Sequence, residues 1–227
     1  MTFTRNKECL KYFVAAFIIL ICIYSNKIAD LFIPIFDNVY YGNLTDMFVA
    51  IASAIIWGLE ILVIGLVARR FKVYLYKDPN ADKSEMELWR VVVLFVITIL
   101  PMIIVSACIN WKVKIVYALG VRVTTVGLAC NAAAILSYAV RMILMVMFIR
   151  CVQEGFDKLF EYKNPNLAIP FGAIFALLTF GIIDFFVLRM YLRAFYLVAS
   201  FVYGLIYLIS RRKFSVTYIL CYLIYLL

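Results

Sequence analysis

The chain has 227 residues, of which 67% are hydrophobic and 15% charged, and its mean hydropathy is +1.03. A soluble domain is closer to half apolar and a quarter charged, so this composition excludes an ordinary water-soluble fold and indicates a chain embedded in lipid. The net charge of +9 is typical of a membrane protein whose basic loops set its orientation. The sequence has no basic patch interleaved with aromatic residues, so it does not indicate a nucleic-acid partner.

The predicted elements are apolar helices, because crossing the hydrocarbon takes about 20 mostly apolar residues. The first, 12–24 with an apolar extension to 36, is predicted to be an uncleaved span because no small-x-small cleavage site follows it. A piece at 115–126 is predicted to be interfacial or re-entrant, and 77–87 a short polar loop. The sequence therefore predicts an all-α, polytopic transmembrane bundle of about seven spans in a single domain, 1–227, whose other spans are 47–67, 88–107, 130–149, 167–188, 194–209 and 214–227.

The distribution of lysine and arginine predicts the orientation of these spans. With the N-terminus inside, the inner segments hold 15 of the 22 basic residues and the outer segments hold 6, while Arg141 lies within a span. Basic residues accumulate in cytoplasmic loops. We therefore expect a multi-pass protein of the cell membrane with a cytoplasmic N-terminus, whose immediate partner is the lipid bilayer.

The side chains missing from the sequence restrict its chemistry. The chain has no histidine, which excludes histidine-based catalysis and histidine metal sites. Its six cysteines form no Cys-x-x-Cys pair and lie mostly in apolar runs, which is typical of small buried residues. We expect neither a metal nor another cofactor.

Two opposite charges fall inside predicted spans, where an ionised group costs about 2.5–3.5 kcal/mol at the bilayer centre. Glu60 lies in the second span and Arg141 in the fourth. Since a charge in a membrane interior usually has a partner, we expect the two residues to form a structural ion pair between helices.

Two acids towards the C-terminus each allow two interpretations. Asp184 lies in the fifth span with no basic residue within four positions. It is either a hydrogen-bonded residue of the bundle core or part of a functional site. Glu154 is either a functional acid or the partner of Arg150 or Lys158, which lie one helical turn before and after it.

Three segments of 127–227 resemble the CAAX protease and bacteriocin-processing family of intramembrane proteases. That family carries Glu-Glu-x-x-x-Arg at a helix end, then Phe-x-x-x-His, then His-x-x-x-Asn. The corresponding segments here run from Gln153-Glu154 to Lys158, from Phe180 to Asp184, and from Cys221 to Tyr225. Residues 1–126 hold no motif that can be placed on the family.

The resemblance implies a catalytic site that has lost its groups. In the family, glutamate and histidine activate water, and a second histidine and the asparagine stabilise the oxyanion. Here one glutamate is Gln153, the arginine is Lys158, and the histidine positions are Asp184 and Cys221, while Tyr225 replaces the asparagine. Glutamine is no base, and a cysteine in apolar surroundings is a poor oxyanion donor.

The sequence leaves three functions open. The favoured one is a non-catalytic membrane scaffold with a groove that binds a peptide, lipid or protein, in the family's contexts of bacteriocin immunity, envelope regulation or protein maturation. The second is an active peptidase in which Glu154 and Asp184 share a proton as a carboxylate dyad. The third is a small transporter or transporter subunit with a polar pathway through Glu60, Arg141 and Asp184.

Overall fold

The computed structural model describes residues 2–25, 42–76, 86–108, 127–160, 169–187 and 190–226, and in these ranges every regular element is helical. Between α7 and α10, three segments continue one another as a single rod: α8 (Phe171–Ala176), the π-helical segment Leu177–Gly181 and α9 (Ile182–Val187). The other helices are α1 (Thr2–Tyr24), α4 (Gly42–Arg70), α5 (Leu88–Cys108), α7 (Gly127–Phe160), α10 (Met190–Ile209) and α11 (Phe214–Leu226).

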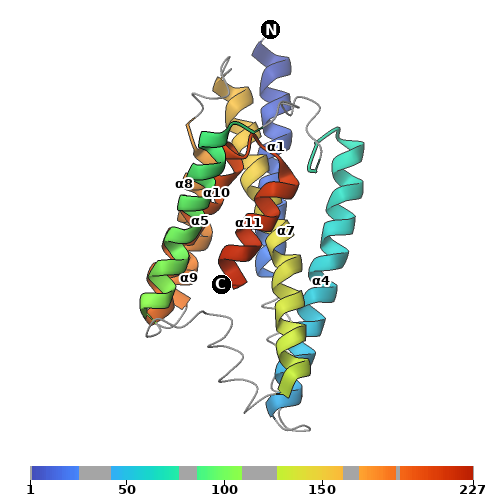
Figure 1. Ribbon diagram of the computed structural model, residues 1–227. Helices are drawn as coiled ribbons and strands as arrows, with labels where there is room; N and C mark the ends of the chain where they lie inside the picture. The colour runs from blue at the N-terminus through green and yellow to red at the C-terminus, as the bar shows by residue number, and fades with distance from the viewer. Residues whose placement is uncertain are drawn as a thin grey trace.

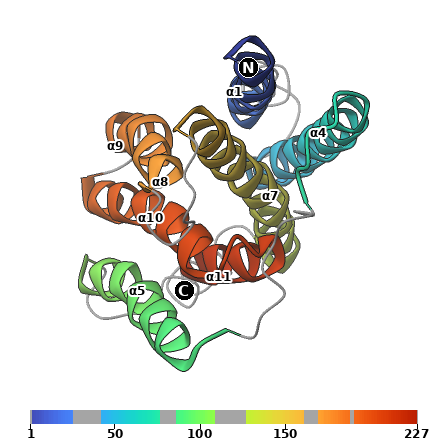
Figure 2. The same cartoon turned by 90° about the horizontal axis from the view of Figure 1, so that it is seen from above.

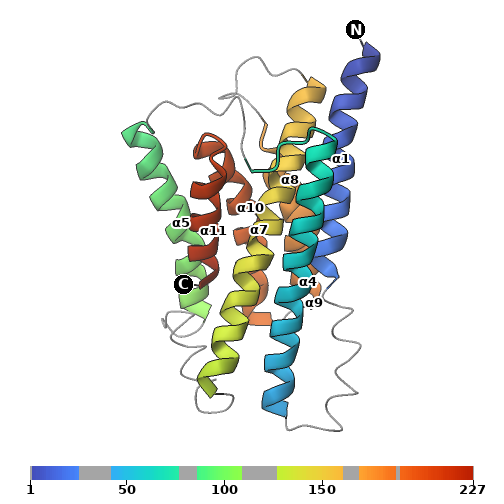
Figure 3. The ribbon, with the colours of Figure 1, turned by 90° about the vertical axis from the view of Figure 1, so that its right-hand side faces the viewer.

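The helices run alternately up and down one axis (Figures 1 and 3). The start of α1, the ends of α4, α7 and α10, and the starts of α5, α8 and α11 therefore lie at one end of the bundle. We call it the basic end, since the segments that meet there carry Lys7, Lys11, Arg69, Arg70, Lys72, Arg90, Arg150, Lys158, Arg211, Arg212 and Lys213.

The centre of the bundle is α7. It contacts α1 and α4 on one side and α8, α10 and α11 on the other (Figure 2). Its stretch from Leu144 to Gln153 is buried at every position, as expected for a helix that is apolar on all faces. At about 1.5 Å per residue its 34 residues extend about 51 Å, which exceeds the hydrocarbon thickness of about 30 Å.

Small residues let helix backbones meet on the α8–α10 side of α7. A Cβ atom added to Gly204 of α10 would lie 2.2 Å from the Cα atom of Ala173 in α8, and one added to Gly172 would lie 2.8 Å from the Ile149 carbonyl oxygen in α7. Contacts this close exclude any side chain at either glycine. Small residues at such crossings are the usual means of packing helices in a membrane.

Two helices end in a left-handed residue that is not glycine. At the end of α4, Lys72 has φ 55° and the Val73 amide donates to the Ala68 carbonyl oxygen at 2.8 Å. At the end of α10, Arg211 has φ 56° and the Arg212 amide donates to the Tyr207 oxygen at 2.9 Å. Both ends form Schellman motifs, which usually place glycine at the left-handed position. The basic side chains there complement the negative end of the helix dipole.

Each predicted span overlaps a helix, so the prediction of an all-α fold is confirmed. Two helical stretches, Met47–Arg70 and Ala132–Phe160, are long and apolar enough to cross a membrane, and the other apolar helices found by the same criterion are shorter. With 13 residues α11 extends only about 20 Å, less than the thickness of the hydrocarbon. The count of seven spans is therefore not confirmed. Residues 28–36 and 115–126 and most of 77–87 lie outside the described ranges.

Candidate functional site

Three charged side chains from two distant segments meet at the basic end. Arg212, in the turn between α10 and α11, points one guanidinium nitrogen at Glu154 Oε1 (3.3 Å) and another at Asp157 Oδ2 (2.7 Å), both acids lying on α7. The three side chains are only 10–17% exposed. We call this group the charged clasp, because it joins the end of α7 to the α10–α11 turn.

Gln153, beside the clasp, is fully buried, and both the nitrogen and the oxygen of its side-chain amide form hydrogen bonds. Its nitrogen donates to Asp157 Oδ1 at 2.9 Å and to the Ile169 carbonyl oxygen at 3.0 Å, while its oxygen accepts from the Gly172 backbone N–H at 3.0 Å. The first N–H groups of a helix have no partner within the helix, so Gln153 satisfies one of those of α8. The side chain thereby fastens α7 to the start of α8.

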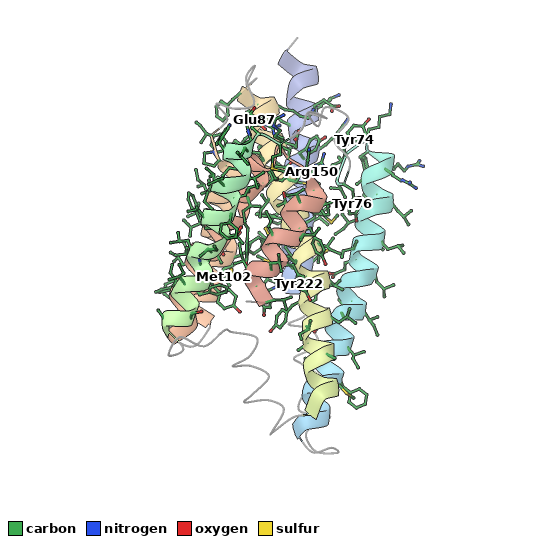
Figure 4. The ribbon with its side chains drawn as sticks, viewed as in Figure 1. Tyr74, Tyr76, Glu87, Met102, Arg150 and Tyr222 are labelled. Atoms are coloured by element: carbon green, nitrogen blue, oxygen red, sulfur yellow. The ribbon has the colours of Figure 1, made fainter. Side chains whose placement is uncertain are left out.

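Other polar side chains at this end also hold segments together. Arg150 is 1% exposed and donates to the Leu75 carbonyl oxygen at 3.3 Å, which ties the segment after α4 to α7. Arg211 pairs with Glu87 at 2.7 Å and so links the α10–α11 turn to the residue before α5. Figure 4 shows Glu87 and Arg150 in the upper, basic part of the molecule, with Tyr222 lower down.

Glu154 has a partner that the sequence prediction did not include. The ion pair with Arg212 joins residues 58 positions apart. Lys158, one of the predicted partners, has its ammonium 5.3 Å from the centre of the Tyr12 ring of α1. Asp157 lies one helical turn from Gln153, so helical spacing alone indicated that those two side chains could meet. No local pattern indicated Arg212.

A second polar group lies halfway along the bundle. Arg141 lines a narrow pocket together with tyrosines from three helices, and the Tyr225 ring lies 4.4 Å from that of Tyr138. We call it the tyrosine pocket. Its volume of about 10 Å³ suits about one water molecule and not a peptide. Sequence reasoning named only Arg141 and Tyr225 among its polar side chains, which also include Tyr138, Tyr196, Ser200 and Tyr203.

Two of the predicted binding residues belong to the packed interior. Phe180 is fully buried with its ring 5.0 Å from that of Phe148 of α7. Cys221 is fully buried with its sulfur 4.0 Å from the Tyr203 carbonyl oxygen of α10. Neither residue lies next to the charged clasp, so the predicted binding residues do not form one surface.

The structure contradicts the predicted ion pair between Glu60 and Arg141. The Glu60 carboxyl interacts with the Ser25 side chain at the end of α1. Arg141 lies in the tyrosine pocket, on the side of α7 that faces α10 and α11. Because α7 separates these two environments, the charges have different neighbours (Figure 2).

The predicted dyad of Glu154 and Asp184 stays a prediction, and the helix backbone separates the two positions. Gly172, at the start of the α8–α9 rod, is bonded to Gln153, the neighbour of Glu154. The backbone of Asp184 lies twelve residues further along that rod, which is about 18 Å at the rise of a helix. Two carboxyl groups share a proton only when they are in contact, so this backbone separation does not favour the dyad. The side chain of Asp184 lies outside the described residues.

No family model, curated protein or solved structure matches the chain. In the described ranges no three His, Cys, Asp or Glu side chains gather as metal ligands. Chemically, the charged clasp can join helices and hold a turn in place. Both carboxylates of the charged clasp contact the Arg212 guanidinium.

Proposed function

We propose that the protein is a non-catalytic, multi-pass membrane scaffold whose basic end faces the cytoplasm. Its two long apolar helices and the many exposed apolar side chains on α1, α4 and α5 support membrane insertion. Large apolar residues there include Phe17, Leu59 and Phe95, each at least 60% exposed. Such surfaces are stable only against lipid or another apolar partner. The gathering of lysine and arginine at one end supports the orientation.

The observation that carries the non-catalytic assignment is the use of Gln153 and Glu154 as structural fasteners. In the protease family that the sequence resembles, two glutamates stand at these positions, and glutamate acts with histidine to activate water. Here the Gln153 amide is hydrogen-bonded to Asp157 of α7 and to the Gly172 N–H of α8. Glu154 is ion-paired to Arg212. A general base needs to reach the proton it abstracts, and these groups are engaged elsewhere. The family membership itself stays a prediction from sequence.

The partner of such a scaffold is a membrane-embedded peptide or protein, in a context such as bacteriocin immunity, envelope regulation or protein maturation. The transporter alternative is weaker because Glu60 and Arg141 lie on opposite sides of α7 and so line no common pathway.

Two measurements test the proposal. The first is alkaline carbonate extraction of membranes, in which an integral protein stays in the pellet, combined with thiol labelling of a single cysteine introduced in place of Lys213. We expect that cysteine to react from the cytoplasmic side only. Recovery of the chain in the supernatant would contradict membrane insertion, and labelling from outside would contradict the orientation.

The second measurement is cleavage of membrane peptides by the purified full chain in proteoliposomes. We expect no turnover by either the natural protein or Glu154→Gln. Turnover that disappears in Glu154→Gln, while the melting temperature stays unchanged, would show that the protein is a peptidase.

A further inference from the structure

An apolar groove runs between α1 and α4 at the basic end. Both helices pack on α7, and Figure 2 shows them on the same side of it. The groove has a volume of about 460 Å³ and is lined by Leu10, Val14 and Ile18 of α1 and by Val63, Ile64 and Val67 of α4. Its walls therefore offer aliphatic side chains and almost no polar atoms.

The length of the groove matches one leaflet of a bilayer. Along α1 it extends from Lys7 to Ile18, which is about 16 Å at the rise of an α-helix. The hydrocarbon of a bilayer is about 30 Å thick, so one leaflet occupies about half of that. An acyl chain lying along the groove would point from the basic end towards the middle of the bundle.

The end of the groove nearest the N-terminus carries basic side chains. Lys7 and Lys11 belong to its lining, and Lys11 is ion-paired with Glu8 at 2.6 Å. Glu8 precedes the predicted first span. Its pKa is lowered chiefly by the hydrogen bond from Lys11, and the charges of Lys158 and Lys72 lower it further. Three lysines thus act on this one carboxylate, and Lys7 is a further basic side chain in the lining of the groove. The mouth of the groove therefore carries more basic than acidic side chains.

We propose that this groove binds an anionic phospholipid of the cytoplasmic leaflet, with one acyl chain along α1 and α4 and its phosphate at Lys7 and Lys11. The inference rests on the membrane insertion proposed above. Basic pockets between helices on the cytoplasmic side are suited to anionic head groups, and lysine can keep its ammonium at the interface while its stem covers apolar surface. The charge at the mouth distinguishes this occupant from a zwitterionic lipid.

Native mass spectrometry of the full chain released from detergent micelles tests the proposal. The probes are phosphatidylglycerol and phosphatidylcholine with identical acyl chains. We expect one retained phosphatidylglycerol in preference to phosphatidylcholine. Lys7→Gln should weaken that preference about fivefold, the effect of one basic residue near an anionic lipid, whereas Lys213→Gln at the same end should leave it unchanged.

A second pair of variants tests the acyl-chain site separately from the charge. Ala15→Trp places an indole in the groove and should abolish the retained lipid. Val96→Trp adds the same bulk at an exposed position of α5 and should have no effect. The two variants also guard against misfolding, since both should keep the melting temperature of the natural protein.

The other possible results distinguish an error in the groove proposal from an error in the proposed membrane insertion. Equal retention of both lipids, or retention that survives Ala15→Trp, overturns the groove proposal while leaving membrane insertion intact. A dimer that Ala15→Trp dissociates shows that a second copy of the chain occupies the groove instead. Loss of the chain from carbonate-washed membranes refutes the proposed function, and the groove proposal with it.

Discussion

The two sides of α7 are packed in different ways. On one side, α8 and α10 approach so closely that Gly204 leaves no space for a methyl group against Ala173. On the other, α1 and α4 each contact α7 but leave a groove of about 460 Å³ between them. An added Cβ at Gly58 of α4 would meet nothing within 4 Å.

This difference indicates where the chain is rigid and where it can accept a ligand. The close backbone contact of α8 with α10 and the hydrogen bonds of Gln153 fix the α8–α10–α11 side, since a change in backbone separation there would break several contacts at once. On the other side, Gly155 of α7 packs closely on the Phe13 ring of α1 and Arg150 bonds to the Leu75 carbonyl oxygen. The α1–α4 side is held mainly by the separate contact of each helix with α7.

The largest effect is expected for Gly204→Ala, which places a methyl group 2.2 Å from a backbone atom of Ala173. We expect the free energy of unfolding to fall by about 3 kcal/mol, the upper part of the range for overpacked cores. Unfolding of the full chain by sodium dodecyl sulfate in mixed micelles measures it. The matched control is Gly58→Ala, which should be neutral or slightly stabilising. Equal losses in both variants would remove the distinction between the two sides.

Arg212→Gln should cost about 2 kcal/mol, because two mostly buried carboxylates lose the cation between them. The same unfolding titration measures the loss, and Lys213→Gln in the same turn serves as the control. A double-mutant cycle with Asp157→Asn should give a coupling energy of about 1 kcal/mol or more. Additive losses would mean that the charged clasp does not join α7 to the turn.

Gln153→Ala should cost about 1.5 kcal/mol, since Gly172 N–H and Asp157 each lose a hydrogen-bond partner in a buried place. The informative comparison is Gln153→Glu, which restores the residue of the protease family. A carboxylate cannot donate to Asp157 or to the Ile169 carbonyl oxygen, so this variant should be no more stable than the alanine variant. A glutamate variant as stable as the natural protein would argue against a purely structural role.

The smallest effect, and the opposite sign, is expected for Lys72→Gly. Lys72 holds a left-handed conformation that disfavours residues with a Cβ atom. After allowance for the greater freedom of glycine in the unfolded chain, we expect a gain of about 0.5 kcal/mol in thermal-melting measurements. Lys72→Ala keeps the Cβ atom and should give no such gain, so a gain in both variants would point to charge and not to backbone strain.

Helix positions followed from the sequence because apolar runs in this chain are long and their boundaries are charged. Their ends did not follow, since the Schellman turns at Lys72 and Arg211 use basic residues where glycine is the usual signal. The number of membrane spans could not be predicted from the sequence either. A run such as 214–227 is apolar enough to suggest a crossing, but its helix is only 13 residues long.

The candidate site was predicted less well than the fold. The sequence singled out Gln153 as a binding residue and Glu154 as a possible catalytic acid, and their contacts with Gly172 and Arg212 became visible only in the structure. The predicted ion pair of Glu60 with Arg141 was wrong because the opposite charges of two residues do not determine on which side of α7 each one lies. The dyad of Glu154 and Asp184 stays a prediction, and sequence spacing did not show how much of the α8–α9 rod separates the two positions.

The inequality of the helices has a consequence for the surrounding lipid. In one bundle, α7 extends about 51 Å and α11 only about 20 Å. In the proposed membrane-inserted state a flat bilayer matches neither helix length, so we expect a hydrophobic mismatch. Tilting brings a long helix nearer to the hydrocarbon thickness, whereas lipid beside a short one thins to meet it. The protein should therefore deform the bilayer unevenly, with its thinnest annulus beside α11.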